Sequence, residues 1–230
     1  IWLDVGALTS PQGTGEIRAN GSDGRNVAGG GGGRIAIYYS TLDGLLQSNI
    51  KSQGGPGNQA GGAGTVYWKD QTGATTYPFV INGNGSNSSY ATTTHEGLSG
   101  ETHIQINNAA VSLKGINPAV KLDLTNSQAT LVDVGTLTGE LNAQGSVLNF
   151  AGDGVISNTH LGLVNSTINI AGNGQFNRTI SLQGGAINVK GNAVFTDTFI
   201  GASAATSSIA IDGQLTVPGN NLVVDGITLS

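Results

Sequence analysis

Two series of apolar residues, each repeating at a nearly constant step, limit the folds open to this chain more than any other feature of its sequence. The first series consists of pairs with one residue between the members: Ile104/Ile106, Leu122/Leu124, Leu141/Ala143, Leu161/Leu163, Ile180/Leu182 and, less regularly, Phe199/Gly201 and Leu222/Val224. The second series has the same form: Val111/Leu113, Ala129/Leu131, Leu148/Phe150, Ile168/Ile170, Ile187/Val189 and Ile209/Ile211. Two independent series with the same step indicate a stack of similar coils.

Each apolar pair has the pattern of a short strand with one buried face, because side chains alternate between the two faces of a strand. Two such strands per coil of about 19 residues, separated by Gly or Asn, predict an all-β fold: a parallel β-solenoid (β-helix) whose coils stack about 4.8 Å apart. The main alternative is an antiparallel sandwich, which also has closely spaced turn signals. A third inward position gives the coil a triangular section, and it is expected at Ile116, Val134 or Leu137, Ile156, Phe176, Phe195 and Leu215.

The middle residues of the second series form an outward polar row, in which amides on successive coils are expected to hydrogen-bond to one another. This row consists of Ser112, Thr130, Asn149, Asn169, Asn188 and Ala210. Four glycines recur shortly after the second strand of a coil, where we expect turns with positive φ: Gly152, Gly172, Gly191 and Gly213.

The N-terminal part of the chain contains a different repeat. Residues 17–39 read IRANGSDGRNVAGGGGGRIAIYY and residues 50–69 read IKSQGGPGNQAGGAGTVYWK. Each copy begins with a short alternating segment, continues through a Gly-rich loop, and ends in a strand-like run. A flexible linker is the alternative, but β-branched and aromatic residues at the ends of each copy favour strands.

The pattern ANG followed by a loop and by GGGGGRIAIYY resembles the glycine-rich repeats of very large bacterial cell-surface and adhesin-type proteins. The resemblance covers roughly residues 15–69, and the second copy departs from it where Thr65-Val66-Tyr67 replaces Arg34-Ile35-Ala36. It implies a repetitive structural or adhesive role.

These patterns divide the chain into a Gly-rich β repeat region (1–69), a polar connector or surface loop (70–100), and the solenoid (101–230). Glycine accounts for 38 of 230 residues, while charged residues make up only 10% of the chain, against about 25% in typical soluble domains. The net charge of -5 argues against nucleic-acid partners, which require clustered Lys and Arg. The lack of Cys and Met, with Ile1 first, suggests a processed or excised piece without a membrane span.

Candidate catalytic and metal-binding residues are few, and we expect no enzyme activity, metal or cofactor. Asp133, Asp153 and Asp212 follow the second strand of their coils, where Asp-Gly or Asn-Gly has an ordinary role in turns. The cluster His95, Glu96, Glu101 and His103 could ligate a metal but lacks metalloprotease spacing, and Asp23 stands alone as a calcium candidate. A polysaccharide lyase or glycoside hydrolase is the least favoured hypothesis, since several β-solenoids cleave polysaccharides.

Sugar binding is the alternative function, and its candidate residues are Tyr38, Tyr39, Tyr67 and Trp68, at matching ends of the two repeats. Adjacent strand residues face opposite ways, so half of these side chains are expected in the core. Sequons at Asn20, Asn84, Asn87, Asn165 and Asn177 arise readily by chance in a chain of this composition.

The favoured function is that of a secreted or cell-surface structural module of a fibre, stalk or adhesin. Open solenoid ends expose unpaired strand edges, which must be capped or paired. The expected partners are therefore copies of the same chain or adjoining repeats of a larger polypeptide, with surface glycans as a further possibility.

Overall fold

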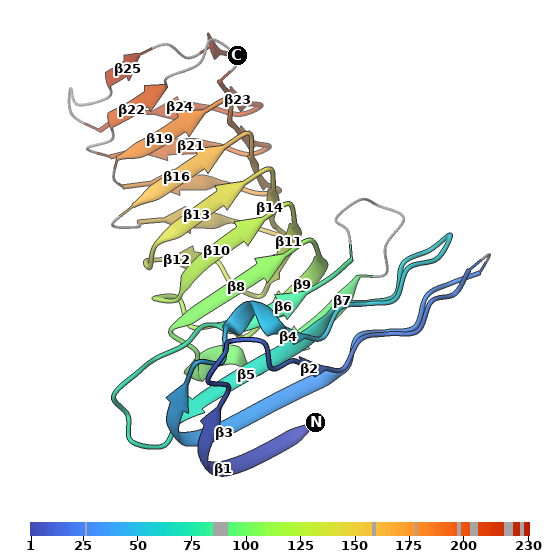
Figure 1. Cartoon of the computed structure of the whole chain (residues 1–230). Coiled ribbons are helices and arrows are strands. Elements are labelled where there is room, and N and C mark those ends of the chain that lie inside the picture. Colours follow the sequence, from blue (N-terminus) through green and yellow to red (C-terminus); the bar gives the residue numbers. More distant parts are fainter. Residues whose placement is uncertain are drawn as a thin grey trace. The chain divides into compact units, whose positions relative to one another are not determined.

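The computed structural model describes residues 1–25, 27–84, 92–157, 160–177, 179–196, 199–202, 207–218, 223–225 and 228–230. The fold is all-β, with 51% strand and 3% helix, and it contains a parallel β-solenoid of about 6 turns, about 20 residues apart (Figure 1). The predicted fold class is thus confirmed. The chain forms two compact units: a repeat unit (Ile1–Thr93 with His103–Ala110) and a solenoid unit (Thr94–Thr102 with Val111–Ser230).

The repeat unit is built on one sheet with the strand order β1-β3-β5-β6-β8. Its elements are β1 (Trp2–Thr9), β2 (Ile17–Arg18), β3 (Arg34–Asp43), η1 (Gln47–Asn49), β4 (Ile50–Lys51), β5 (Gly64–Asp70), β6 (Phe79–Asn82) and β8 (His103–Asn107). Strands β5 and β6 pair antiparallel, whereas β1 with β3, β3 with β5, and β6 with β8 pair parallel. A second small sheet joins β2 to β4 in parallel.

The two Gly-rich repeats lie on each other in the register that their sequence alignment predicts. Ile17 pairs with Ile50, and Arg34 pairs with Thr65. The inward side chains of β3 and β5 form the core of the unit, in which Ile37 is 0% exposed. The repeat is therefore one coil stacked on an equivalent coil.

The Gly-rich loops pack backbone against backbone, so they are not flexible linkers. Gly55 N–H donates to Gly30 O at 2.7 Å, and Gly21 N–H donates to the Gln53 carbonyl at 2.8 Å. A Cβ on Gly55 would lie 1.9 Å from Ser22 O, a distance that no side chain allows. Glycine is required here because the backbones are too close for any side chain.

The described residues of the stretch 70–100, expected as a connector or surface loop, include two strands and a 3-10 turn. Strand β6 lies in it, together with β7 (Thr93–Glu96) and η2 (Leu98–Gly100). Phe79-Val80-Ile81 supplies the β-branched and aromatic residues that favour a strand, and Ile81 is 0% exposed. The high Thr, Ser and Gly content around it concealed this strand.

The solenoid unit has three ladders of parallel strands, whose coils follow one another up the stack in Figure 1. The first contains β10 (Lys121–Thr125), β13 (Leu141–Gln144), β16 (Leu161–Val164), β19 (Ile180–Gln183), β22 (Phe199–Ala202) and β25 (Val223–Asp225). The second contains β7, β9 (Ala110–Lys114), β11 (Gln128–Val132), β14 (Val147–Phe150), β17 (Thr167–Ile170), β20 (Ala186–Val189), β23 (Ser208–Ile211) and β26 (Thr228–Leu229). The third contains β12 (Thr136–Leu137), β15 (Gly154–Ile156), β18 (Gly174–Phe176), β21 (Ala193–Phe195) and β24 (Leu215–Thr216).

Both apolar series pair coil to coil in the predicted register over most of the solenoid. Leu122 pairs with Leu141, and Ile168 pairs with Ile187. Of the two choices for the third position, Leu137 is the one that pairs, with Ile156. The third column continues to Phe176 and Phe195, whose rings stack at 4.7 Å and 10°.

The register departs from the prediction in the last coils. Ile180 pairs with Ile200, not with Phe199. This coil is therefore one residue longer than the sequence series predicts. Leu215 pairs with Ala193 and is 38% exposed, so it does not continue the inward column. Leu222 lies outside the described residues.

Among the described residues, positive φ occurs at coil corners after both strands: after the second strand at Gly115 and Asp133, with φ of 64° and 62°, and more often after the first strand. Asn126, Gly145 and Asn165 have φ of 46°, 58° and 47°. Each precedes a buried serine: Ser127, Ser146 and Ser166. Ser146 Oγ accepts from Ser127 N–H at 3.0 Å, and Ser166 Oγ accepts from Ser146 N–H at 3.0 Å, so hydroxyls bridge successive coils.

The predicted turn glycines Gly152, Gly172, Gly191 and Gly213 are not among the positive-φ residues. At Gly172 and Gly191 the requirement for glycine comes from close approach instead. A Cβ on Gly172 would lie 2.9 Å from the backbone N of Asp153, and one on Gly191 would lie 2.7 Å from Gly172 O. Stacked coils meet too closely at this corner for a side chain.

Candidate functional site

The four aromatic residues predicted to bind sugar lie on two different faces of the sheet. Tyr39 and Trp68 are 3% and 5% exposed and belong to the core. Their burial removes them as surface contacts for a glycan, and it raises the pKa of the Tyr39 hydroxyl. Tyr38 and Tyr67 point to the opposite face and are half-buried. Strand alternation produces this split, as expected.

Trp2 lies with Tyr38 and Tyr67 on the sheet face opposite to Tyr39 and Trp68, which we call the outer face. We call these three residues the aromatic row. The rings of Trp2 and Tyr38 stack at 4.6 Å, and Tyr38 meets Tyr67 edge-on at 5.8 Å. Trp2 was not among the predicted residues, because the parallel pairing of β1 with β3 that brings it to Tyr38 has no local sequence signal. Trp2 is 68% exposed.

The two repeats do not place their aromatic residues directly opposite each other. Tyr67 pairs with Ala36, and Tyr38 pairs with Lys69. The rings of Tyr38 and Tyr67 therefore meet diagonally across two strands, a distance that aromatic side chains span.

Polar side chains continue this face beside Tyr38. Gln71 Nε2 donates to Asp4 Oδ1 at 2.8 Å, and Ser40 Oγ donates to Gln71 Oε1 at 3.2 Å. Aromatic rings beside a carboxylate and an amide combine an apolar surface with hydrogen-bonding groups, which is the chemistry that sugar rings and hydroxyls contact.

Strand β1 forms one border of the repeat sheet, and no other strand pairs with its outer edge among the described residues. Leu3 and Val5 pair with Ile37 and Tyr39, so they occupy the same columns as core residues. On β3 these columns are at most 3% exposed, whereas Leu3 and Val5 are only half-buried. The core of the repeat unit is thus incompletely covered at β1.

The outward polar row of the solenoid is a hydrogen-bonded ladder over part of its length. Asn188 Nδ2 donates to Asn169 Oδ1 at 2.8 Å, and Asn169 Nδ2 donates to Asn149 Oδ1 at 2.8 Å. Asn149 Nδ2 reaches Thr130 Oγ1 at 3.5 Å, and Ser112 lies half-buried on β9. Each amide thus links neighbouring coils without using a charged group.

The aspartates considered for catalysis have structural contacts or stand at turns. Asp153 Oδ1 accepts from Asn173 N–H at 2.7 Å, and Asn173 Oδ1 accepts in the same way from Asn192 N–H at 3.0 Å. Asp133 has a φ of 62°, and Asp212 is exposed after β23. Asp153 therefore accepts a hydrogen bond from the next coil, and Asn accepts the equivalent bond on the following coils.

The four residues weighed as a metal-binding candidate do not form a metal site in the described part of the chain, where no group of three or more His, Cys, Asp or Glu has a suitable arrangement. His95 is buried at 8% exposure, and Glu96 forms an ion pair with Lys114 at 3.7 Å. Asp23 accepts from Arg25 N–H at 2.7 Å, as a turn aspartate does.

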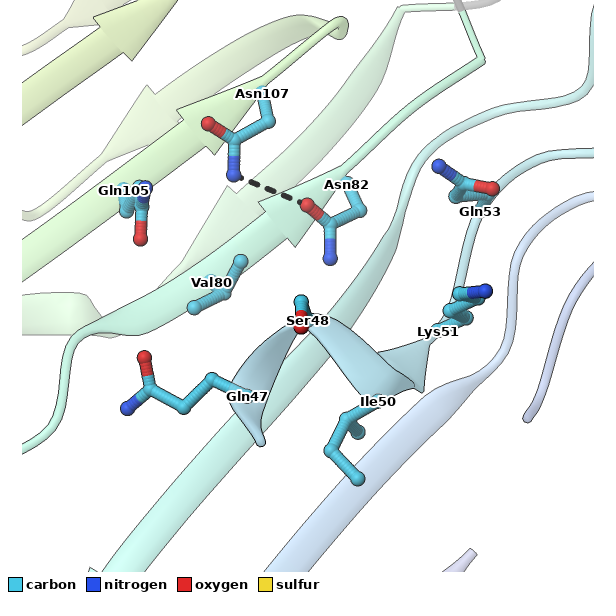
Figure 2. A pocket seen from close by; sticks show the side chains of 9 residues that line it. All are labelled: Gln47, Ser48, Ile50, Lys51, Gln53, Val80, Asn82, Gln105 and Asn107. Atoms are coloured by element: carbon cyan, nitrogen blue, oxygen red, sulfur yellow. Dashed lines mark hydrogen bonds between the residues drawn. The ribbon is translucent and has the colours of Figure 1, made fainter. Parts of the chain in front are cut away.

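A pocket that the sequence did not suggest lies in the repeat unit (Figure 2). It has a volume of about 300 Å³, and its lining is rich in amides: Gln47, Ser48, Ile50, Lys51, Gln53, Val80, Asn82, Gln105 and Asn107. We call it the amide pocket. Its residues come from η1, β4, β6 and β8 and the segment after β4, so segments far apart in the sequence form one site.

Strand pairing explains why these side chains share a face. Val80 pairs with Gln105, and Asn82 pairs with Asn107. Ile81 lies between Val80 and Asn82, points the other way, and is 0% exposed. Asn107 Nδ2 donates to Asn82 Oδ1 at 3.1 Å, which fixes the orientation of both amides.

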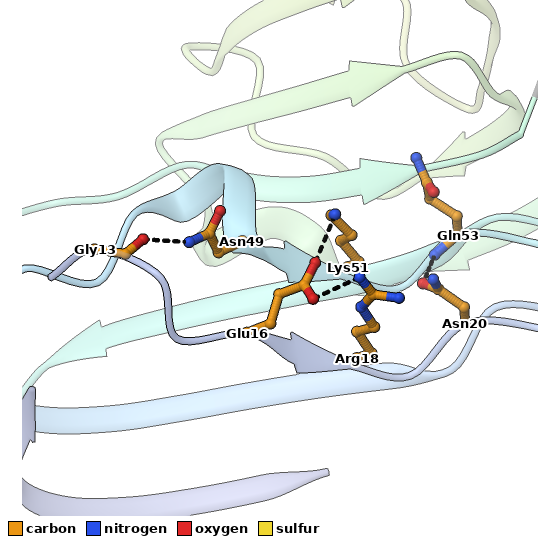
Figure 3. Close-up of polar contacts among 7 residues, drawn as sticks. All are labelled: Gly13, Glu16, Arg18, Asn20, Asn49, Lys51 and Gln53. Carbon is orange, nitrogen blue, oxygen red and sulfur yellow. Dashed lines mark hydrogen bonds and ion pairs between the residues drawn. The ribbon is translucent and has the colours of Figure 1, made fainter. Parts of the chain in front are cut away.

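The charged residue of the amide pocket is neutralised by a neighbour (Figure 3). Lys51 Nζ donates to Glu16 Oε1 at 2.6 Å, and Arg18 reaches the other Glu16 oxygen at 2.5 Å. Hydrogen bonds from Lys51 and Arg18 lower the pKa of Glu16, so it remains a carboxylate. Asn49 Nδ2 donates to Gly13 O at 2.7 Å and Asn20 Oδ1 accepts from Gln53 N–H at 3.0 Å, which ties the wall of the pocket to the preceding coil.

Comparison with known proteins gives no assignment, because no family model, curated protein or solved structure matches this chain significantly. In the part of the chain that the structure describes, no helix is both long enough and apolar enough to cross a membrane.

Proposed function

We propose that this chain is an extracellular structural module of a fibre, stalk or adhesin, which extends by stacking coils on adjoining repeats or on copies of itself. The observation that carries the proposal is the uncovered edge of β1. One more coil in the register of β3 would complete the pairing of β1 and cover its half-buried side chains.

The edge has the chemistry of an unfinished stack. Leu3, Val5 and Leu8 are half-buried hydrophobic residues packed against the core, and covering each of them contributes about 1 kcal/mol. The charged side chain on β1, Asp4, is on the outer face and accepts a hydrogen bond from Gln71. A long strand edge with apolar side chains toward the core is a template for pairing with another strand.

The solenoid supports the same role. Its coils are joined by backbone ladders, apolar columns and amide ladders, in which few groups titrate. Such a stack tolerates changes of salt and pH, because screening acts on charges and these contacts have almost none. This suits a module that bears load outside the cell.

Electron microscopy of the purified chain at rising concentration tests the proposal. We expect filaments with an axial repeat, and we expect Val5→Lys to suppress them, because it places a charge on the face that the next coil would cover. Val27→Lys is the matched control, since Val27 is 68% exposed in a loop. Single particles at every concentration would contradict self-stacking, and equal filament formation by both variants would exclude β1 as the contact.

The second candidate is a carbohydrate-binding module, which the aromatic row with Asp4 and Gln71 supports. The two candidates make different use of Trp2: a neighbouring coil would cover its ring, whereas a glycan needs it exposed. A glycan array with Trp2→Ala and Tyr67→Ala separates them. Lost signal supports sugar binding by the row, and unchanged signal removes these residues from the function.

A further inference from the structure

We propose that the amide pocket is a binding site for a neutral saccharide. The site lies on the opposite face of the repeat sheet from the aromatic row, because Val66 and Val80 pair across β5 and β6 while Tyr67 points the other way. It does not depend on filament formation, and its ligand does not require Trp2, Tyr38 or Tyr67.

The pocket provides hydrogen-bonding groups that the protein itself leaves unused. Within the described residues, the side-chain amides of Gln47 and Gln105 have no hydrogen-bond partner, and the one bond between Asn107 and Asn82 leaves the donors of Asn82 and the acceptor of Asn107 available. An amide carries both donors and acceptors, so several amides around one cavity match the hydroxyls of a sugar, each of which donates and accepts.

The pocket also has an apolar side. Val80 lies between the amides in Figure 2, whereas the Ile50 side chain points away from them and belongs to the buried core of the unit, at 3% exposure. A sugar ring has hydroxyls at its edge and C–H groups on its faces, so it uses amides and an aliphatic patch together. The volume of about 300 Å³ is at the small end of ligand sites and suits one or two sugar rings.

Charge selects a neutral ligand over an anionic one. Lys51 is the charged residue of the lining, and its ammonium is held by Glu16 at 2.6 Å. A phosphate or a uronate would have to compete with this carboxylate for Lys51. Recognition of anions ordinarily uses an unpaired Arg or Lys that makes charge-assisted hydrogen bonds.

The test is titration of the full chain with free neutral hexoses and N-acetylhexosamines, and with the matching uronic acids, followed by calorimetry and amide NMR shifts. We expect a neutral sugar to bind with a dissociation constant of about 1–10 mM, typical of few contacts to a small ligand. Gln105→Leu should weaken binding at least tenfold. Gln175→Leu is the matched control, because Gln175 also points outward from a strand but lies outside the pocket.

Two further variants show whether a loss of sugar binding comes from the amide pocket itself. Tyr67→Ala should leave binding unchanged, which separates this site from the aromatic row. If Gln105→Leu fails to fold, Asn82→Ala replaces it. The proposal is overturned if no sugar binds at about 100 mM, if Gln105→Leu and Gln175→Leu bind equally, or if a uronic acid binds more tightly than the neutral sugars.

Discussion

Removing the Phe176 ring should cost the solenoid a large part of its stability. Phe176 is 0% exposed, pairs with Ile156 and Phe195, and stacks on the Phe195 ring at 4.7 Å. Neighbouring coils are fixed on three sides by strand ladders, so they cannot collapse into the cavity that Phe176→Ala leaves. Large-to-small changes of this kind cost about 3–5 kcal/mol, and the lost ring stacking contributes about 0.5–1.5 kcal/mol of that total.

The assay is urea denaturation followed by far-UV circular dichroism, with stability taken from the midpoint and the slope m. Gln175→Ala changes the adjacent exposed side chain and should cost less than about 0.5 kcal/mol. Phe176→Leu, which keeps most of the volume, should fall between the two variants. A lower m in Phe176→Ala would show that the C-terminal coils unfold separately, as nearest-neighbour coupling in a stack allows.

The reasoning would be refuted if Phe176→Ala cost less than about 1 kcal/mol at unchanged m. That result would mean that the inward column contributes little and that the backbone ladders alone maintain the stack. The columns identified from the sequence would then describe geometry without describing stability.

Two further predictions concern the repeat unit. Asp70 accepts hydrogen bonds from the Thr72 hydroxyl and from the Thr72 and Thr75 backbone amides, and these bonds lower the pKa of its carboxyl group. The contribution of Asp70 to folding stability is therefore present above the unfolded pKa of about 4, and it is lost as pH falls through the lower folded pKa. Asp70→Asn should flatten the loss of melting temperature between about pH 5 and pH 2, and an unchanged slope would contradict this. Gly55→Ala should separate the two Gly-rich loops, because its Cβ would meet Ser22 O at 1.9 Å, and we expect faster amide hydrogen exchange there. Gly31→Ala, at a position in the same loops with open space around its Cβ, should leave them protected, and equal exchange in both variants would contradict the close-approach argument.

The repeats of the chain could be predicted from sequence because a parallel stack places each residue above its equivalent one coil away. A constant step between apolar pairs therefore fixes both the strand and its register. This holds from Leu122 to Val189 and fails near Phe199, where the coil is one residue longer and Ile180 therefore pairs with a different residue than the constant step predicts.

The same logic explains the success with the Gly-rich repeats and its limit at the aromatic residues. Aligning Ile17 with Ile50 predicted the strand register correctly, since aligned residues stack. It did not show which of Tyr38 and Tyr39 faces the core, because two adjacent aromatic residues give alternation no polar neighbour from which to choose a face.

The sequence by itself determined the solenoid, its step and its columns, because these follow from short-range alternation repeated at a fixed interval. Only the tertiary structure decided the antiparallel pairing of β6 with β5 and the stacking of Trp2 on Tyr38. It also decided the amide pocket, in which Gln47 and Gln105 line one cavity. Each of these depends on where distant segments meet. Such meetings are set by the packing of whole coils, and no local pattern of residues records them.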